Sequence, residues 1–122
     1  MTKTILTIDD SPSIRQMVAM TLGGAGYRVL QAENGLEGYN QATANAVNAV
    51  VVDLNMPVMN GLDFLRKFRG HPSGKGVPVV LLTTESDEAL KKQAREAGAT
   101  GWIVKPFNPA QLLSVIAKVA GA

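Results

Sequence analysis

The sequence lacks cysteine entirely and has a single histidine among its 122 residues. Without thiols the chain forms no disulfide bond and no thiolate metal site, which agrees with a reducing compartment. The one histidine, His71, stands in RGHPSGKG, a stretch rich in glycine, proline and serine. It has no identifiable partner for metal binding or catalysis, so we interpret His71 as a solvated loop residue.

Long apolar runs are also missing. The apolar stretches fall far short of the ~20 residues that span a bilayer. The opening segment MTKTILTIDD has neither the apolar run nor the small-residue cleavage site of an export signal. We therefore expect a cytoplasmic protein that does not insert into a membrane. A chain of 122 residues has room for one domain, over residues 1–122, and none for an output domain.

Neither sign of charge dominates the sequence. It contains 12 basic and 10 acidic residues, a formal net charge of +2. The basic residues form no clustered stripe of the kind that binds nucleic acid, so we expect no nucleic-acid partner. With 46% hydrophobic and 18% charged residues, the composition is typical of a globular domain.

Short β-branched runs alternate with stretches of helical period. This pattern predicts strands over residues 4–8, 27–31, 49–53, 78–83 and 101–105, and helices over 12–22, 36–44, 61–69, 87–97 and 109–119. Ser11-Pro12 and Asn108-Pro109 each place a capping side chain before a proline at the first helical position. Glycines at positions 23, 24, 26 and 98 indicate helix ends.

The order of these elements predicts the fold class. VVVDL and PVVLL are nearly continuous apolar runs, as expected of central parallel strands covered by helices on both faces. Five strand–helix units indicate an open α/β fold, a (βα)5 doubly wound parallel five-stranded sheet, rather than an eight-stranded barrel. We expect the flavodoxin-like strand order 2-1-3-4-5. In that order the ligand crevice lies beyond the carboxyl ends of the first and third strands.

Polar side chains stand where four of the five predicted strands end. Because the strands are parallel, these ends meet at one edge of the sheet, around the crevice. The second strand ends in Ala32-Glu33, at the edge of the sheet and away from the crevice. The other four strand ends carry Asp9 and Asp10, Asp53, Thr83 and Thr84, and Lys105.

Three clustered carboxylates repel one another unless a cation neutralises them. A hard divalent ion with oxygen ligands does so, and the small number of protein ligands favours Mg²⁺ that retains several waters. A phosphoryl group is the natural companion of Mg²⁺. Asp53, the central acid, could attack phosphorus and form an acyl phosphate while Mg²⁺, Lys105 and the Thr83 hydroxyl bind the equatorial oxygens.

Two other classes share part of this pattern. A haloacid-dehalogenase-type phosphatase also uses a strand-end aspartate as nucleophile, but it needs a second acid two residues on, where this chain has Asn55. A flavin-binding flavodoxin shares the fold, but IDDSPS after the first strand would repel its cofactor phosphate. Turnover of a phosphomonoester would favour the phosphatase, and a yellow chromophore would favour the flavodoxin.

Four motifs together carry a resemblance that covers the whole chain. IDDSPSIR, VVDLNMPVMNG, VVLLTTE and WIVKPF, in this order and spacing, resemble the receiver domain of two-component response regulators. The resemblance implies that Asp53 is the phosphoacceptor. It also implies that Asp10, Asp53 and the backbone carbonyl of Asn55 ligate Mg²⁺, with Asp9 acting through water. Pro57 and Gly61 fit the loop that follows the phosphoacceptor.

The resemblance also assigns the phosphoryl contacts and the switch. It implies that Lys105 and Thr83 contact the phosphoryl group and that the Lys105–Pro106 peptide is cis. Thr83 is expected to move toward the phosphoryl oxygen, and Trp102 occupies the position of an aromatic residue that turns inward behind it. Trp102 is larger than the usual tyrosine or phenylalanine, so packing and docking are alternative roles. Thr84 is bulkier than the usual following residue and is expected to tune dephosphorylation.

A receiver without a linker or second domain resembles the stand-alone CheY-type chemotaxis regulators. Asn55 and Glu85 match what those regulators carry two residues after the phosphoacceptor and two after the switch threonine. The resemblance implies phosphorylation by a sensor histidine kinase and phosphorylation-dependent binding to the flagellar motor switch. The alternative is a phosphorelay shuttle or phosphate sink without motor binding. In each case we expect a monomeric signalling switch that catalyses only its own phosphorylation and dephosphorylation, and not an enzyme acting on other substrates.

The resemblance places the docking surface on the predicted helix 87–97, strand 101–105 and helix 109–119. When the three aspartates and Lys105 of the site are set aside, 11 basic and 7 acidic residues remain. This mild excess favours an acidic or amphipathic peptide as partner. The residues that this surface offers are Lys91, Lys92, Arg95, Trp102 and Lys118.

Overall fold

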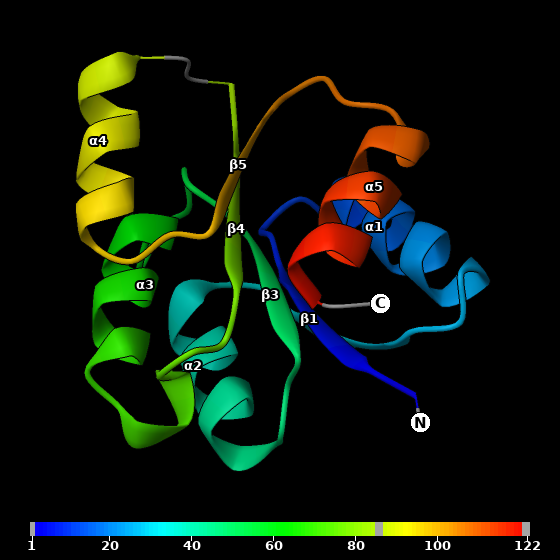
Figure 1. Cartoon of the computed structure of the whole chain (residues 1–122), viewed down its shortest axis with the longest axis horizontal. Helices are drawn as coiled ribbons and strands as arrows, with labels where there is room; N and C mark the ends of the chain where they lie inside the picture. Colours follow the sequence, from blue (N-terminus) through cyan, green and yellow to red (C-terminus); the bar gives the residue numbers. More distant parts are fainter. Residues whose placement is uncertain (1, 85–86, 121–122) are drawn as a thin grey trace.

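Five parallel strands alternate with five α-helices in the computed structural model, which describes residues 2–84 and 87–120 (Figure 1). The strands are β1 (Thr4–Ile8), β2 (Arg28–Ala32), β3 (Ala49–Asp53), β4 (Val79–Thr83) and β5 (Gly101–Val104). The helices are α1 (Pro12–Gly24), α2 (Gly35–Ala44), α3 (Gly61–Arg69), the short 3₁₀ helix η1 (Pro72–Gly74), α4 (Glu88–Glu96) and α5 (Pro109–Ala120). No helix within the two described ranges is long and apolar enough to cross a bilayer.

The sheet has the strand order β2-β1-β3-β4-β5, so the predicted doubly wound order is confirmed. Every neighbouring pair is parallel, with Ile8 opposite Val52, Asp53 opposite Leu82 and Thr83 opposite Val104. This register brings the ends of β1, β3, β4 and β5 to one edge of the sheet. The chain leaves β1 in one direction along the sheet for β2 and then returns past it to β3, which makes β1 and β3 the switch point.

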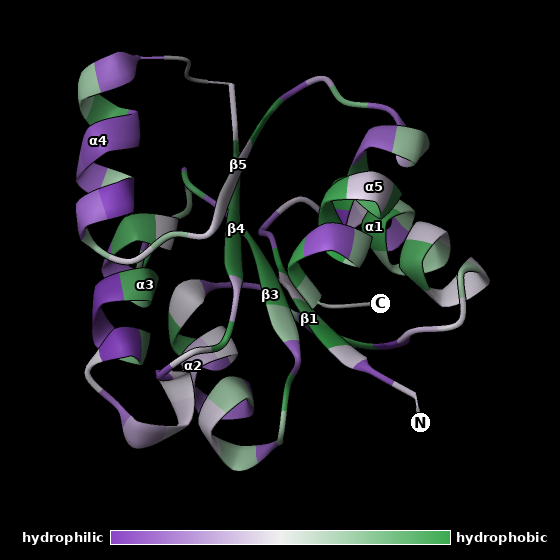
Figure 2. Cartoon of the chain, in the orientation of Figure 1, coloured by the Kyte–Doolittle hydropathy of each residue, from purple (hydrophilic) through white to green (hydrophobic). Residues whose placement is uncertain are grey.

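Helices cover both faces of the sheet. Helices α1 and α5 lie on one side, and α2, α3 and α4 lie on the other (Figure 1). The strands are the most continuously apolar part of the chain, while the helices show mixed polar and apolar faces (Figure 2). Residues alternate along each strand between two core clusters. On β4, Val79 and Leu81 pack toward α3 and α4, whereas Val80 and Leu82 pack toward α1 and α5.

The predicted end of the first helix is wrong by two residues. Helix α1 continues through Gly23 and Gly24 because the residue that adopts the left-handed conformation is Gly26, with φ +98°. The Gly26 N–H donates to the Gly23 carbonyl and the Tyr27 N–H donates to the Leu22 carbonyl. This pair of bonds is the Schellman arrangement. Gly98, with φ +103°, ends α4 in the same way, as predicted.

The loop that contains His71 is more ordered than the sequence indicates. His71 Nδ1 accepts a hydrogen bond from the Ser73 N–H at 3.0 Å and so caps η1, which the sequence pattern does not predict. The imidazole also meets the Tyr39 ring edge-on, with 5.9 Å between ring centroids. His71 is therefore a loop residue as predicted, but a half-buried one with a local structural role.

Gly61 lets α3 begin directly against the end of β3. A Cβ built on Gly61 would lie 2.6 Å from the Asp53 carbonyl oxygen and 3.0 Å from the Leu54 Cα. The Gly61 N–H donates to the Leu54 carbonyl at 3.0 Å. The close approach involves backbone on both sides, which a rotamer change cannot relieve.

We expect Gly61→Ala to lower the free energy of unfolding by about 1–3 kcal/mol because the added methyl group displaces backbone atoms. Gly23→Ala is the matched control, since that glycine lies in α1 with nothing within 4 Å of an added Cβ. This control is expected to raise stability by about 0.5–1 kcal/mol. Urea unfolding of both variants measures the difference, and equal stabilities would contradict the packing argument.

Candidate functional site

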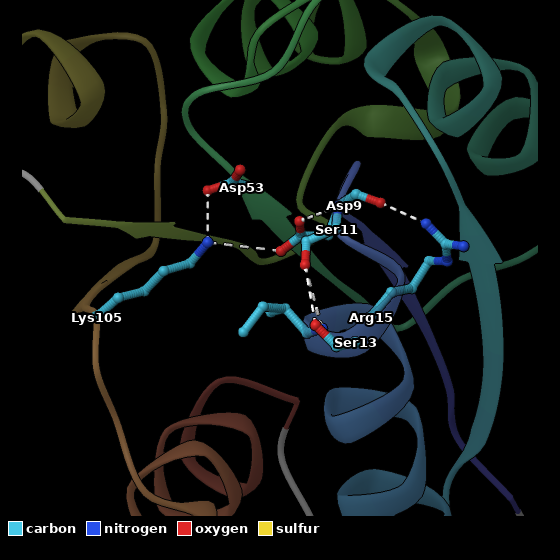
Figure 3. Close-up of polar contacts among 7 residues, drawn as sticks. Asp9, Ser11, Ser13, Arg15, Asp53 and Lys105 are labelled. Atoms are coloured by element: carbon cyan, nitrogen blue, oxygen red, sulfur yellow. Dashed lines mark hydrogen bonds and ion pairs between the residues drawn. The ribbon is translucent and has the colours of Figure 1, made fainter.

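The ends of β1 and β3 and the loop after β5 bring two buried acids and one lysine together. Lys105 Nζ lies 3.0 Å from Asp53 Oδ1 and 3.6 Å from Asp9 Oδ2 (Figure 3). Asp9 is only 1% exposed and Asp53 only 5%. β5 ends at Val104, one residue earlier than predicted, so Lys105 reaches the acids from the start of the following loop. Its peptide bond to Pro106 is cis.

A third acid completes the cluster. One carboxylate oxygen from each of Asp9, Asp10 and Asp53 lies within 4.8 Å of the others. Asp9 and Asp53 are buried, whereas Asp10 is exposed at the rim. Asp9 Oδ2 is buried and accepts no hydrogen bond within the described part of the chain. This oxygen is paired with Lys105 only by charge, at 3.6 Å. An all-oxygen donor set of this kind suits a hard divalent cation such as Mg²⁺.

The β1–α1 loop is built around the other oxygen of Asp9. Asp9 Oδ1 accepts a hydrogen bond from the Ser11 N–H at 2.9 Å. Ser11 in turn caps α1, where its Oγ accepts from the Ile14 N–H at 3.5 Å, and Pro12 is the first helical residue. The predicted cap is therefore confirmed. The same short segment ends a strand, begins a helix and orients an acid.

Burial raises the pKa of the Asp53 carboxyl above its ordinary value. The hydrogen bond and positive charge of Lys105 lower it, and the negative charges of Asp9 and Asp10 raise it further. The net direction is upward. The folded chain therefore holds Asp53 ionised at a cost, which a bound cation would reduce.

The remaining predicted residues that the structure describes differ in their burial. Thr83 is fully buried at the end of β4, whereas Thr84 is exposed. Asn55 is exposed in the loop between β3 and α3. Glu85 lies outside the described residues. The roles of these side chains in phosphorylation stay predictions.

Nearly the whole chain matches a known family. The family model of the response regulator receiver domain matches residues 5–117. The chain belongs to this receiver family. The prediction made from the four sequence motifs is thereby confirmed.

Individual receivers are similar over nearly their full length. Chemotaxis protein CheY1 of Helicobacter pylori is 40% identical over 119 residues, which cover 96% of each chain. The structure of Vibrio cholerae chemotaxis protein CheY4 has a TM-score of 0.94 at 42% identity and covers 98% of this chain and 99% of that one. These similarities support a two-component response regulator of the chemotaxis type.

A third relative was solved with its metal. The receiver domain of sensor histidine kinase PA1611 from Pseudomonas aeruginosa has a TM-score of 0.91 at 25% identity, with all of both chains covered. In that protein a magnesium ion is coordinated in the active site cleft.

Sequence reasoning missed a feature of this receiver's β3–α3 loop. Val58 has φ +70° and is 79% exposed. The Met59 N–H donates to the Pro57 carbonyl at 2.8 Å across it, which is the three-residue pattern of a γ-turn with positive φ. A β-branched residue rarely adopts this conformation, so nothing in the local sequence predicts it.

Trp102 lies on β5 and packs partly against the core cluster on the α4 side of the receiver. With Lys91, Ala94 and Arg95 of α4, it lines a surface pocket of about 220 Å³. The indole Nε1 is buried and donates no hydrogen bond to the described residues. The half-buried ring therefore packs against the core and also lines the surface pocket. Its roles in switching and docking stay predictions.

We expect the stability of the natural receiver to fall relative to Asp53→Asn as pH rises. An acid whose folded pKa exceeds its unfolded value near 4 favours the folded state when protonated. That advantage is lost between the unfolded and the raised folded pKa. Urea unfolding at stepped pH in EDTA measures this difference. Asp63→Asn, on the exposed surface of α3, is the control, and a pH-independent difference for Asp53→Asn would contradict the assignment.

Proposed function

We propose that this receiver accepts a phosphoryl group on Asp53 from the phosphohistidine of a sensor histidine kinase. The observation that carries the proposal is the Asp53 carboxylate, buried at the end of β3 with its Oδ1 3.0 Å from Lys105 Nζ. A carboxylate held in this way is positioned for attack, and the surrounding groups match the needs of phosphoryl transfer. Family membership and the chemotaxis relatives support the same conclusion.

The proposed transfer forms one bond and breaks one. An oxygen of the ionised Asp53 carboxylate attacks phosphorus, while the bond from phosphorus to the donor imidazole nitrogen breaks and its electron pair stays on that nitrogen. The product is an acyl phosphate on Asp53. Lys105 is close enough to Asp53 to contact one oxygen of the new phosphoryl group. The Thr83 hydroxyl at the end of β4 would bind another phosphoryl oxygen.

Mg²⁺ is the proposed cofactor. Asp10, Asp53 and the backbone carbonyl of Asn55 would hold it, with Asp9 acting through water. The acid cluster and the magnesium ion in the PA1611 receiver support this proposal. When bound, the ion supplies positive charge that offsets both the carboxylates and the phosphoryl oxygens. The chemistry is confined to the gain and loss of the chain's own phosphoryl group, so we propose a switch rather than an enzyme.

We expect intact-mass measurement after incubation with acetyl phosphate and Mg²⁺ to show one added phosphoryl group. The adduct should be absent from Asp53→Asn and from the natural chain in EDTA, because both lack part of the site. If rapid hydrolysis hides the adduct, binding of beryllofluoride with Mg²⁺ provides the second measurement. A chain that gives neither the adduct nor beryllofluoride binding would contradict phosphorylation of Asp53.

We propose that the phosphoryl signal leaves the molecule through the surface of α4, β5 and α5. The pocket beside Trp102 is flanked there by Lys91 and Arg95, with Lys92 and Lys118 exposed on the same elements. An acidic peptide with one apolar side chain fits this combination of charge and pocket. The similarity to chemotaxis proteins supports the flagellar motor switch as the partner.

We expect a purified flagellar motor switch protein to bind more tightly after beryllofluoride loading. Arg95→Glu should weaken this binding, most strongly at low salt because exposed charges are screened. Lys75→Glu, an equal charge change on an exposed loop residue, should not. Titration with Trp102 fluorescence as the readout measures both. Unchanged affinity after loading, together with reversible transfer to a histidine protein, would favour the phosphorelay shuttle.

A further inference from the structure

Arg15 makes a contact that the proposed reaction does not use. Its guanidinium Nη1 donates a hydrogen bond to the backbone carbonyl of Asp9 at 2.7 Å. Arg15 lies in the first turn of α1, where its own N–H donates to the Ser11 carbonyl at 3.0 Å. Figure 3 shows the guanidinium on the side of Asp9 that faces away from Lys105. The arginine therefore holds the main chain of the site and not its carboxylates.

The carbonyl that Arg15 holds belongs to the peptide group joining Asp9 to Asp10. Peptide groups are planar, so fixing this carbonyl also fixes the N–H of Asp10 and the direction in which its Cα leaves. Asp9 has further attachments: its N–H donates to the Ala32 carbonyl and its Oδ1 accepts from the Ser11 N–H. The Asp10 carboxylate is exposed and makes no ion pair or hydrogen bond with residues 2–84 and 87–120. Its position depends on the backbone alone.

We propose that Arg15 is a positioning residue for the divalent cation site, acting on Asp10 through the Asp9–Asp10 peptide. The inference rests on the proposed role of the acid cluster in binding Mg²⁺. A charged donor on a backbone carbonyl makes a stronger hydrogen bond than a neutral one. Groups that orient metal ligands from behind typically change metal affinity by 10–100-fold when removed.

A purely electrostatic role for Arg15 predicts the opposite change in Mg²⁺ affinity, so the sign of the change distinguishes the two roles. If Arg15 acted only as a nearby positive charge, its removal would reduce repulsion of Mg²⁺ and tighten binding. If Arg15 positions Asp10, removal leaves the Asp10 backbone free to rotate and weakens binding. A purely structural role in α1 would lower stability without changing Mg²⁺ affinity.

The experiment is calorimetric titration of the metal-free chain with Mg²⁺. We expect Arg15→Met, which keeps the apolar stem and loses the donor, to bind Mg²⁺ about tenfold more weakly. Arg15→Lys keeps a charged donor and should lie between Arg15→Met and the natural chain. Arg66→Met removes an equal charge from an exposed site on α3 and should leave the affinity unchanged. Urea unfolding without metal reports the stability of each variant separately.

The outcomes separate this inference from the proposed function. If the natural chain binds no Mg²⁺, the proposed cofactor itself is overturned. Natural chain that binds Mg²⁺, with Arg15→Met binding equally well or more tightly, would overturn only the positioning role. If Arg15→Met is too unstable to titrate, Arg15→Lys decides the question. A structural role follows if Arg15→Lys binds Mg²⁺ as tightly as the natural chain but is less stable without metal. Weaker Mg²⁺ binding by Arg15→Lys at unchanged stability would support positioning.

Discussion

One ammonium group faces three carboxylates at the carboxyl edge of the sheet, and the chemistry of the site depends on this imbalance. Lys105 lies within 3.6 Å of Asp9 and within 3.0 Å of Asp53, so its single charge is shared between two buried acids. Burial raises the pKa of Asp53 while Lys105 lowers it. The proposed cation and phosphoryl group would thus meet charges and donors that are already in place, and little reorganisation would be needed on binding.

The parallel sheet allows a chain of 122 residues to bring these carboxylates and Lys105 together. Helices on both faces bury the strands, so polar groups gather at the edge where strands end. Close backbone approach keeps that edge compact: Gly61 sits against Asp53, and a Cβ on Gly35 would lie 2.5 Å from the Met59 carbonyl oxygen. The β3–α3 loop therefore approaches the backbone closely at Gly61 and at Met59, and Val58, with its positive φ, precedes both.

The fold and the central site residues were predictable because they depend on patterns of short range. Strand runs, helix caps and the order of βα units follow from local side-chain properties, and parallel register then brings Asp9, Asp53 and Lys105 together. The γ-turn at Val58 was not predictable, because a β-branched residue rarely adopts positive φ. The continuation of α1 through Gly23 was not predictable either, because any of three nearby glycines could supply the left-handed residue that ends the helix, and Gly26 does so. Arg15 belongs to the motif IDDSPSIR, but nothing in the sequence indicates that its side chain donates to a main-chain carbonyl.

The same register connects the proposed phosphorylation of Asp53 with the surface beside α4. Leu81 pairs with Trp102 across β4 and β5, and Thr83 lies two residues beyond Leu81 on the same strand. Side chains two apart on a strand share a face, so Thr83 and Trp102 both belong to the α4 side of the sheet. A displacement of the buried Thr83 side chain must be accommodated by this closely packed layer. Trp102 packs against the core and lines the surface pocket, as do Ala94 and Ala99. A displacement of Thr83 would therefore change the shape of this pocket, which the proposed partner would contact.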